Sequence, residues 1–156
     1  MHTIRHAIEH GFLQLPKIAV IVSRHVLGKR RWRARAEDGT DFGFDLEAPL
    51  KHGQAIFRNS RAAYVIEQEA EPVLLIRFGS CKEAATIAWQ IGNLHFPAAI
   101  EEGGLLVEDD IAIRQMLDRQ QISFTAVEEI FQPVYAAGAH HHHHDHEHDP
   151  EEHHAH

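Results

Sequence analysis

The chain has 156 residues, 44% of them hydrophobic and 24% charged, which allows a folded core and excludes a wholly disordered protein. The formal net charge is −8 and neither half is strongly basic, so no nucleic-acid-binding surface is expected. The longest apolar run near the N-terminus, residues 18–22, is too short for a signal peptide or a membrane span. We therefore expect a cytoplasmic protein with no membrane partner.

Short strand-like segments separated by turns fill the first half of the chain. The strand candidates are residues 17–22, 31–36, 42–46, 55–57 and 64–68. Between the second and third of them, Asp38-Gly39 is a dipeptide that favours a hairpin turn. We predict an all-β domain over residues 1–71. In its N-terminal segment His2, His6 and His10 recur every four residues, but we expect this end of the chain to be frayed and solvated.

After Glu71-Pro72 the pattern changes to alternating strands and helices. Residues 73–78 read as a strand, and Ser80 and Glu83 have the spacing of a helix-capping box. The helix that follows places four apolar residues on one face, namely Ala84, Ile87, Ala88 and Ile91. Cys81, the single cysteine, cannot form an intrachain disulfide, and we expect it to be buried on this helix.

The remaining elements complete a known order. Two short strands, 98–101 and 105–108, flank a glycine-rich turn, and a second helix begins at Asp109-Asp110, whose carboxylates favour a helix N-terminus. Residues 122–127 form the last strand. The order β-α-β-β-α-β predicts a ferredoxin-like domain over residues 72–138, so the fold class is α+β.

The last segment, residues 139–156, is a tail rich in histidine and acid. It holds ten of the 16 histidines and five carboxylates with no Lys or Arg, so we expect it to be disordered. A purification tag is the alternative interpretation, but the interspersed acids favour a natural segment. Neutral imidazole suits Ni(II), Cu(II) and Zn(II), so the tail is predicted to collect divalent metal. The predicted tail ligands are His140, His141, His142, His143, His144, His146, His148, His153, His154 and His156.

A second candidate ligand lies in the run Gly92-Asn93-Leu94-His95-Phe96-Pro97. One histidine cannot define a metal site, and a surface histidine at a helix end is the simpler interpretation. If two copies of the chain met about a two-fold axis near His95, each copy would offer its own imidazole to a shared ion.

This run, placed after the first helix of a ferredoxin-like half and followed by a His-rich terminus, resembles the UreE family of urease accessory proteins. The segments 38–46, 50–53 and 110–117 carry the same resemblance, which covers nearly the whole chain. It implies a homodimer that binds Ni(II) as cargo and delivers it for assembly of the urease active site. It also implies that His95 is the shared ligand, completed or supplied by tail histidines, and that the first half contacts the urease accessory GTPase and the urease apoprotein assembly complex.

Two positions depart from the family pattern. Gln54 stands where the family commonly has an acid. Where some members carry a spaced histidine pair, this chain has Glu108-Asp109-Asp110-Ile111, so a second histidine site is not expected there, although the aspartates could offer oxygen ligands or simply start the helix.

The alternative function is that of a protein-binding chaperone or scaffold whose tail is a general metal buffer. We do not expect an enzyme, because the body lacks a nucleophile-and-base pair, a phosphate-binding glycine loop or an HExxH metal site. The ligand types alone do not select nickel over zinc or copper, and they leave open whether metal links two dimers and which tail histidines join His95.

Overall fold

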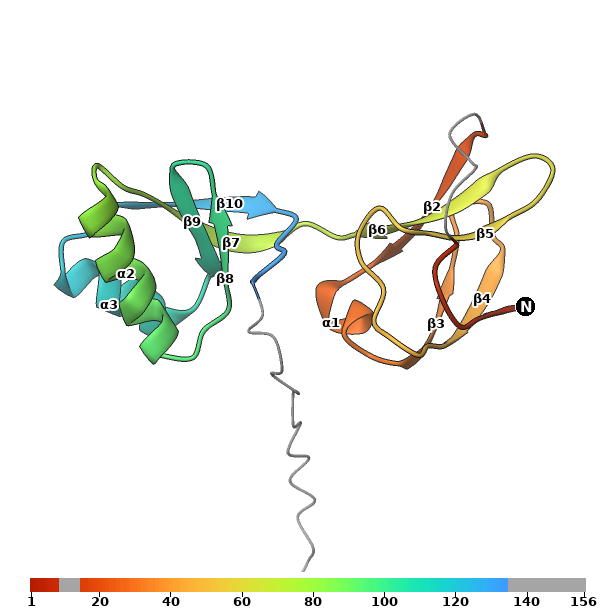
Figure 1. The fold of residues 1–156 in the computed structure, drawn as a ribbon, viewed down its shortest axis with the longest axis horizontal. Helices are drawn as coiled ribbons and strands as arrows, with labels where there is room; N and C mark the ends of the chain where they lie inside the picture. Colours follow the sequence, from red (N-terminus) through yellow and green to blue (C-terminus); the bar gives the residue numbers. More distant parts are fainter. Residues whose placement is uncertain (9–14, 135–156) are drawn as a thin grey trace, which may run out of the picture.

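The structure is a computed structural model that describes residues 1–8 and 15–134. Within these ranges the chain is a mixed α+β protein, as predicted, and Figure 1 shows its elements in two groups joined by one extended segment. In chain order they are β1 (His2–Ile4), β2 (Lys17–Val22), α1 (Arg24–Leu27), β3 (Arg31–Arg35), β4 (Asp41–Asp45), β5 (Ala55–Arg58), β6 (Ala63–Gln68), β7 (Glu71–Arg77), α2 (Cys81–Asn93), β8 (Ala98–Glu101), β9 (Gly104–Glu108), α3 (Ile111–Arg119) and β10 (Phe124–Glu129). The predicted tail lies outside the described residues.

Two three-stranded sheets form the first group, in the orders β1-β4-β3 and β2-β6-β5. The five strands predicted for this half are present, each to within one residue at either end. The hairpin between β3 and β4 turns at Gly39, whose φ of +87° suits glycine. Asp38 accepts hydrogen bonds from the Thr40 amide (3.0 Å) and the Tyr64 hydroxyl (2.8 Å), which lower its pKa.

Two features of this half contradict the predictions. The half is not all-β, because the four-residue helix α1 lies between β2 and β3 and buries Leu27. The N-terminus is not frayed at His2, which belongs to β1 and pairs in parallel with β4. The His2 ring stacks on Phe57 with 4.3 Å between ring centroids, so aromatic packing holds this end of the chain. His10 lies outside the described residues.

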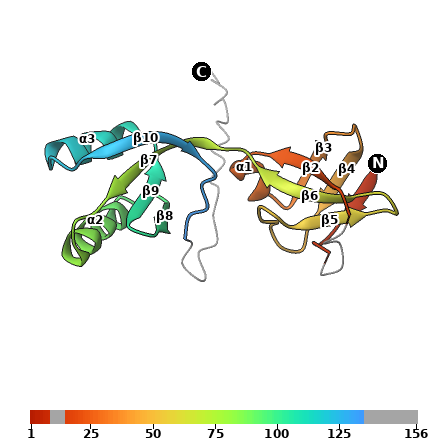
Figure 2. The same cartoon turned by 90° about the horizontal axis from the view of Figure 1, so that it is seen from above.

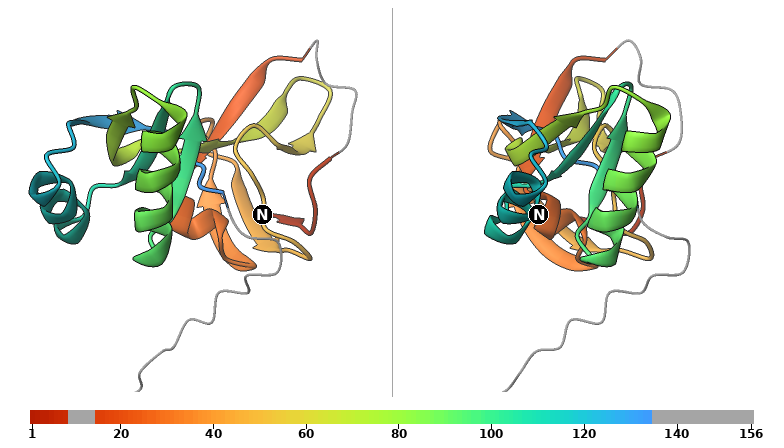
Figure 3. Two further views of the ribbon diagram at one scale, coloured as in Figure 1. Left: turned by 60° about the vertical axis from the view of Figure 1, so that its left-hand side comes forward. Right: turned by 90° about the vertical axis from the view of Figure 1, so that its left-hand side faces the viewer.

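The second group has the chain order β-α-β-β-α-β and forms one antiparallel sheet with strand order β10-β7-β9-β8. Helices α2 and α3 lie on one face of this sheet (Figures 1 and 3). Side chains alternate between the two faces of a strand, so Leu74 and Ile76 of β7 pack beneath the helices with Ile87 and Ile91 of α2. None of the helices in the described part of the chain is long and apolar enough to cross a membrane.

Local capping sets where the helices begin. The Glu83 amide donates to Ser80 Oγ at 3.2 Å, and the Glu83 carboxylate accepts from the Gly79 amide at 2.7 Å. Asp110 caps α3 by accepting from the Ala112 amide at 2.7 Å. Both predicted helix starts are therefore confirmed. The expectation that Cys81 is buried is wrong: it occupies the first turn of α2 and is exposed.

The face of the sheet opposite the helices is covered by the chain that follows β10. Phe131 is fully buried there against Val73, Ala99 and Leu106 of three different strands. Beyond it, the Val134 amide donates to the Ala98 carbonyl at 2.8 Å, which places residue 134 at the β8 edge. We call residues 130–134 the strap. Figure 2 shows the chain leaving β10 and turning back beneath the sheet.

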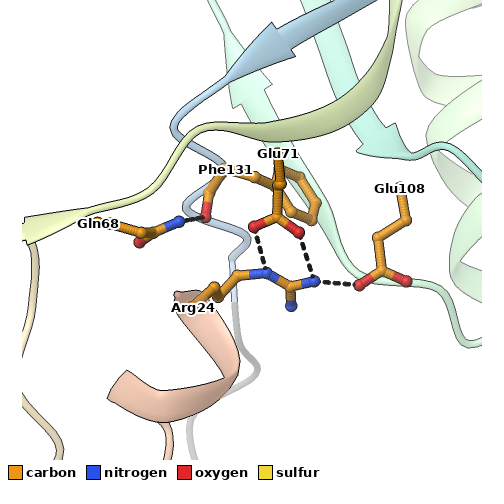
Figure 4. A network of polar contacts seen from close by, with 5 residues as sticks. All are labelled: Arg24, Gln68, Glu71, Glu108 and Phe131. Carbon is orange, nitrogen blue, oxygen red and sulfur yellow. Dashed lines mark hydrogen bonds and ion pairs between the residues drawn. The ribbon is translucent and has the colours of Figure 1, made fainter. Parts of the chain in front are cut away.

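A network of polar contacts joins the two groups where β6 leads into β7 (Figure 4). Arg24 of α1 reaches the second group, donating to both carboxylate oxygens of Glu71 at 2.8 and 3.1 Å and also to Glu108. Its guanidinium lies 5.0 Å from the centre of the Phe131 ring. The Gln68 side-chain amide donates to the Phe131 carbonyl at 2.7 Å. We call these five residues the junction.

Candidate metal site

His95 stands in the connection between α2 and β8. The last helical residue of α2 is Asn93, and β8 begins at Ala98. The His95 side chain is exposed. Helix α2 is held on the sheet by Ile87 and Ile91, so His95 is presented at the end of a packed element rather than on a long loop. An exposed imidazole in this position can bind an ion arriving from solvent.

The backbone at His95 is left-handed, with φ of +60°, and its amide donates to the Gly92 carbonyl at 3.0 Å. Left-handed residues commonly end helices, and glycine is the usual choice because other residues pay a steric cost there. The backbone conformation at this position favours glycine, which has no side chain, but the chain has histidine there. Functional sites are where such backbone strain concentrates.

This strain predicts the stability of two variants. In metal-free protein, His95→Gly should be more stable than His95→Ala by about 1 kcal/mol, because only glycine adopts positive φ without cost. Gly92 is the matched control: it lies inside α2 with nothing within 4 Å of an added Cβ, so Gly92→Ala should stabilise by about 0.5–1 kcal/mol. Urea unfolding measures both. Equal stability of the two His95 variants would contradict the strain.

Nothing else in the described part of one chain completes a site at His95. Within residues 1–8 and 15–134, no group of three or more His, Cys, Asp or Glu side chains is placed to hold a metal ion. Divalent transition metals in proteins take about four or more ligands. Further ligands must therefore come from a second copy, from residues outside the described ranges, or from both.

The two aspartates at the start of α3 have structural partners. Asp110 caps the helix, and Asp109 accepts from Arg114, with 2.6 Å between Arg114 Nη2 and Asp109 Oδ2. The hydrogen bond from Arg114 lowers the pKa of Asp109. These contacts support the helix-start interpretation of both residues over a role as oxygen ligands.

Exposed apolar side chains surround the position of His95 in the chain. Trp89 on α2, Leu94 next to His95, and Ile100 on β8 are 67%, 44% and 71% exposed. Exposed large apolar side chains are typical of protein-protein interfaces. Leu94, directly beside His95 in the chain, is thus suited to contact another protein.

The other predicted metal ligands, from His140 to His156, lie outside the described residues. The last described residue, Val134, is hydrogen-bonded to Ala98 at the β8 edge.

Comparison with known proteins identifies the family. The family model for the C-terminal domain of the UreE urease accessory protein matches residues 71–156, just over half of the chain. A urease accessory protein UreE from Chelativorans sp. is 31% identical over 131 residues, which cover 81% of this chain and 83% of the relative.

The chain belongs to the UreE family of urease accessory proteins.

Further relatives of the same name agree with this assignment. One from Lysinibacillus sphaericus is 30% identical over 116 residues, covering 73% of this chain and 78% of the relative. Another, from Geobacillus kaustophilus, is 33% identical over 100 residues, covering 63% and 68%. The UreE match begins at residue 71, where β7 begins, and it includes both His95 and the tail.

Sequence reasoning missed the junction and the strap of this UreE-family chain. Arg24 lies in a four-residue helix too short to show a period, and its partners are 47 and 84 residues away. The strap has no repeating pattern. Its one signal is Phe131, an aromatic residue between Ile130 and Gln132, whose burial becomes clear only when the uncovered sheet face is known.

Proposed function

We propose that this UreE-family chain is a metallochaperone that binds Ni(II) and delivers it for assembly of the urease active site. The observation that carries the proposal is His95, an exposed and strained histidine without co-ligands in the described part of its own chain. A metal site that one copy of the chain cannot complete alone suits a protein that passes its ion to a partner. The ten tail histidines supply exchangeable ligands in the same molecule.

The chain acts as a homodimer in this proposal. Each copy contributes His95 to one ion near a two-fold axis, because an isologous interface brings a residue close to its symmetry mate. Burial of Trp89, Leu94 and Ile100 would stabilise such an interface, since apolar area removed from water is worth about 25 cal/mol per Å². The exposure of these side chains, all within six residues of His95 along the chain, supports this arrangement.

Capture, holding and release follow from ligand chemistry. Tail histidines bind the ion first, and the interspersed carboxylates attract divalent cations. The His95 pair then holds the ion, together with tail histidines. A partner protein with better placed ligands then takes the ion by stepwise exchange of ligands. Separate imidazole ligands suit such an exchange. Because a metal ligand must be neutral imidazole, binding is expected to weaken as the pH falls below about 6.5.

The identity of the metal is taken from the family. Imidazole and carboxylate also bind Zn(II) and Cu(II), and intrinsic affinity favours copper. Nickel as the cargo is therefore the part of the proposal that depends on membership in the UreE family and not on the ligand types.

The division of labour follows the two groups of elements. Residues 1–71 would form a domain that contacts the accessory GTPase and the urease apoprotein assembly complex. Residues 72–138 would form a ferredoxin-like domain for dimerisation and metal binding, and residues 139–156 the metal-collecting tail. The strand order β10-β7-β9-β8 and the start of the family match at residue 71 support this division. The protein would act in the cytoplasm and catalyse no reaction.

Reconstitution of urease tests delivery. Urease apoprotein and its other accessory proteins are mixed at limiting Ni(II) with the full chain, with a chain ending at Gly138, or with His95→Ala. We expect the full chain to raise the yield of active urease and His95→Ala to lose that gain. If His95→Ala and the shortened chain both activate like the full chain, the protein is a scaffold with a metal-buffering tail and the proposal is wrong.

A further inference from the structure

One buried polar side chain of the first group holds the strap. Within residues 1–8 and 15–134, Gln68 is the one polar residue that is buried, at 7% exposed. It ends β6, and its side-chain amide donates to the Phe131 carbonyl at 2.7 Å (Figure 4). Buried amides are stable in a protein only when they are hydrogen-bonded. These two residues are 63 positions apart, so the bond forms only when both groups are folded and in contact.

The first group fixes the position of this donor. Gln68 pairs with Val22 in the parallel ladder between β6 and β2, and its backbone amide donates to His52 Nδ1 at 3.1 Å. The side chain that reaches the strap therefore extends from an ordered strand and not from the connection between the groups. If the first group moves away from the second, the donor moves away from Phe131.

The Phe131 ring contacts both groups. Within the second group it is fully buried against side chains of β7, β8 and β9. From the first group, the Arg24 guanidinium lies 5.0 Å from the centre of the ring, where a cation is attracted by the ring electrons. Arg24 is held there by its bonds to Glu71 and Glu108 of the second group. Its contact with the ring therefore requires that the first group stays docked.

We propose that the junction couples the strap to the docking of the two groups. The strap lies on the second sheet while Gln68 and Arg24 are in place, and it is released when the first group is drawn away. Such coupling is reciprocal, because each contact that favours docking favours the seated strap by the same factor. A protein that binds the first group and pulls it away would uncover the sheet face beneath Phe131. No metal ligand takes part in this coupling, so it is independent of the proposed function.

The alternative arrangement is a strap held by the second group alone. Two contacts would then suffice, the packing of Phe131 on the sheet and the hydrogen bond from the Val134 amide to the Ala98 carbonyl at 2.8 Å. In that arrangement, loss of the Gln68 donor leaves the strap as firmly seated as before. The two arrangements differ in one measurable quantity, which is the fraction of molecules whose sheet face beneath the strap is open.

Thiol labelling at position 99 measures this fraction. Ala99 is 3% exposed beneath the strap, and in the Cys81→Ser background Ala99→Cys carries the single thiol. Gln68→Met keeps the volume of the side chain but removes the donor. We expect it to speed labelling about 5- to 150-fold, the range that one unpaired buried carbonyl implies.

Gln54→Met is the matched control for Gln68→Met. It makes the same substitution in the first group, where the Gln54 side chain accepts a hydrogen bond from a nearby backbone amide at 2.8 Å on the surface. The labelling rate should stay within about twofold of the parent rate. If Gln68→Met labels at the parent rate, or if both variants speed labelling equally, the coupling is wrong.

Reciprocity allows a second test from the side of the strap. Phe131→Ala removes the ring that seats the strap, while the ion pairs of Arg24 with its two glutamates stay intact. Small-angle X-ray scattering of the full chain should show a broader distribution of distances, because docking is weakened. Phe78→Ala, which alters the core beneath the helices of the same sheet, should leave the distribution unchanged. The same distribution for Phe131→Ala as for the natural chain would overturn the coupling.

Discussion

Replacing His95 by alanine is expected to remove the tight Ni(II) site of the full chain and to leave weaker binding by the tail. Removing a residue that only hydrogen-bonds a metal ligand typically lowers metal affinity 10–100-fold. The loss of affinity in His95→Ala should be larger, because a direct ligand disappears from each copy. Calorimetric titration measures both classes of site. His25→Ala is the matched control, since His25 is also exposed but belongs to α1.

This comparison separates two sources of affinity. If the tail alone bound nickel tightly, His95→Ala and His25→Ala would give the same titration curve as the natural chain. That result would contradict the account, because His95 is the one exposed histidine that the structure describes in the C-terminal group.

Replacing Arg24 by methionine is expected to lower the free energy of unfolding by about 1–3 kcal/mol. The Arg24 side chain is 13% exposed and faces two carboxylates, so its removal leaves Glu71 and Glu108 close together without a cation. Their partial exposure keeps the loss below that of a fully buried pair. Methionine retains the apolar contact beside Phe131, so the change reports mainly the lost charge.

Arg31→Met is the control for this variant. Arg31 also pairs with a carboxylate, that of Asp45, but its side chain is 84% exposed and the pair lies within one hairpin. We expect a change within about 0.5 kcal/mol. Small-angle X-ray scattering should show a broader distribution of distances for Arg24→Met and an unchanged one for Arg31→Met. Identical effects of the two substitutions would mean that the junction does not hold the two groups together.

Local signals predicted most of the fold. The Asp38-Gly39 turn and the capping residues Ser80 and Asp110 act within a few residues, so the sequence displays them directly. The strands were visible because apolar residues alternate where one face is buried. The predictions were wrong where contacts between distant residues determine the structure. His2 is held by its ring contact with Phe57. Cys81 is exposed because the buried face of α2 is formed by Ile87 and Ile91.

The candidate site could be predicted only in part. His95 was found through its motif, but its positive φ and its isolation from other ligands required the structure. The strap and the junction depend on pairs of residues 25 or more positions apart, such as Val134 with Ala98 and Arg24 with Glu71. No periodicity or short motif records such pairs, which is why sequence reasoning did not find them.

The central claim is that one ion is shared between two copies of His95. It is tested most directly by native mass spectrometry of the full chain at limiting Ni(II), beside the same chain carrying His95→Ala. The account predicts one tightly held ion per two chains, and only weakly held ions in the variant. One tightly held ion per single chain, or a tightly held ion that survives the loss of His95, would contradict it.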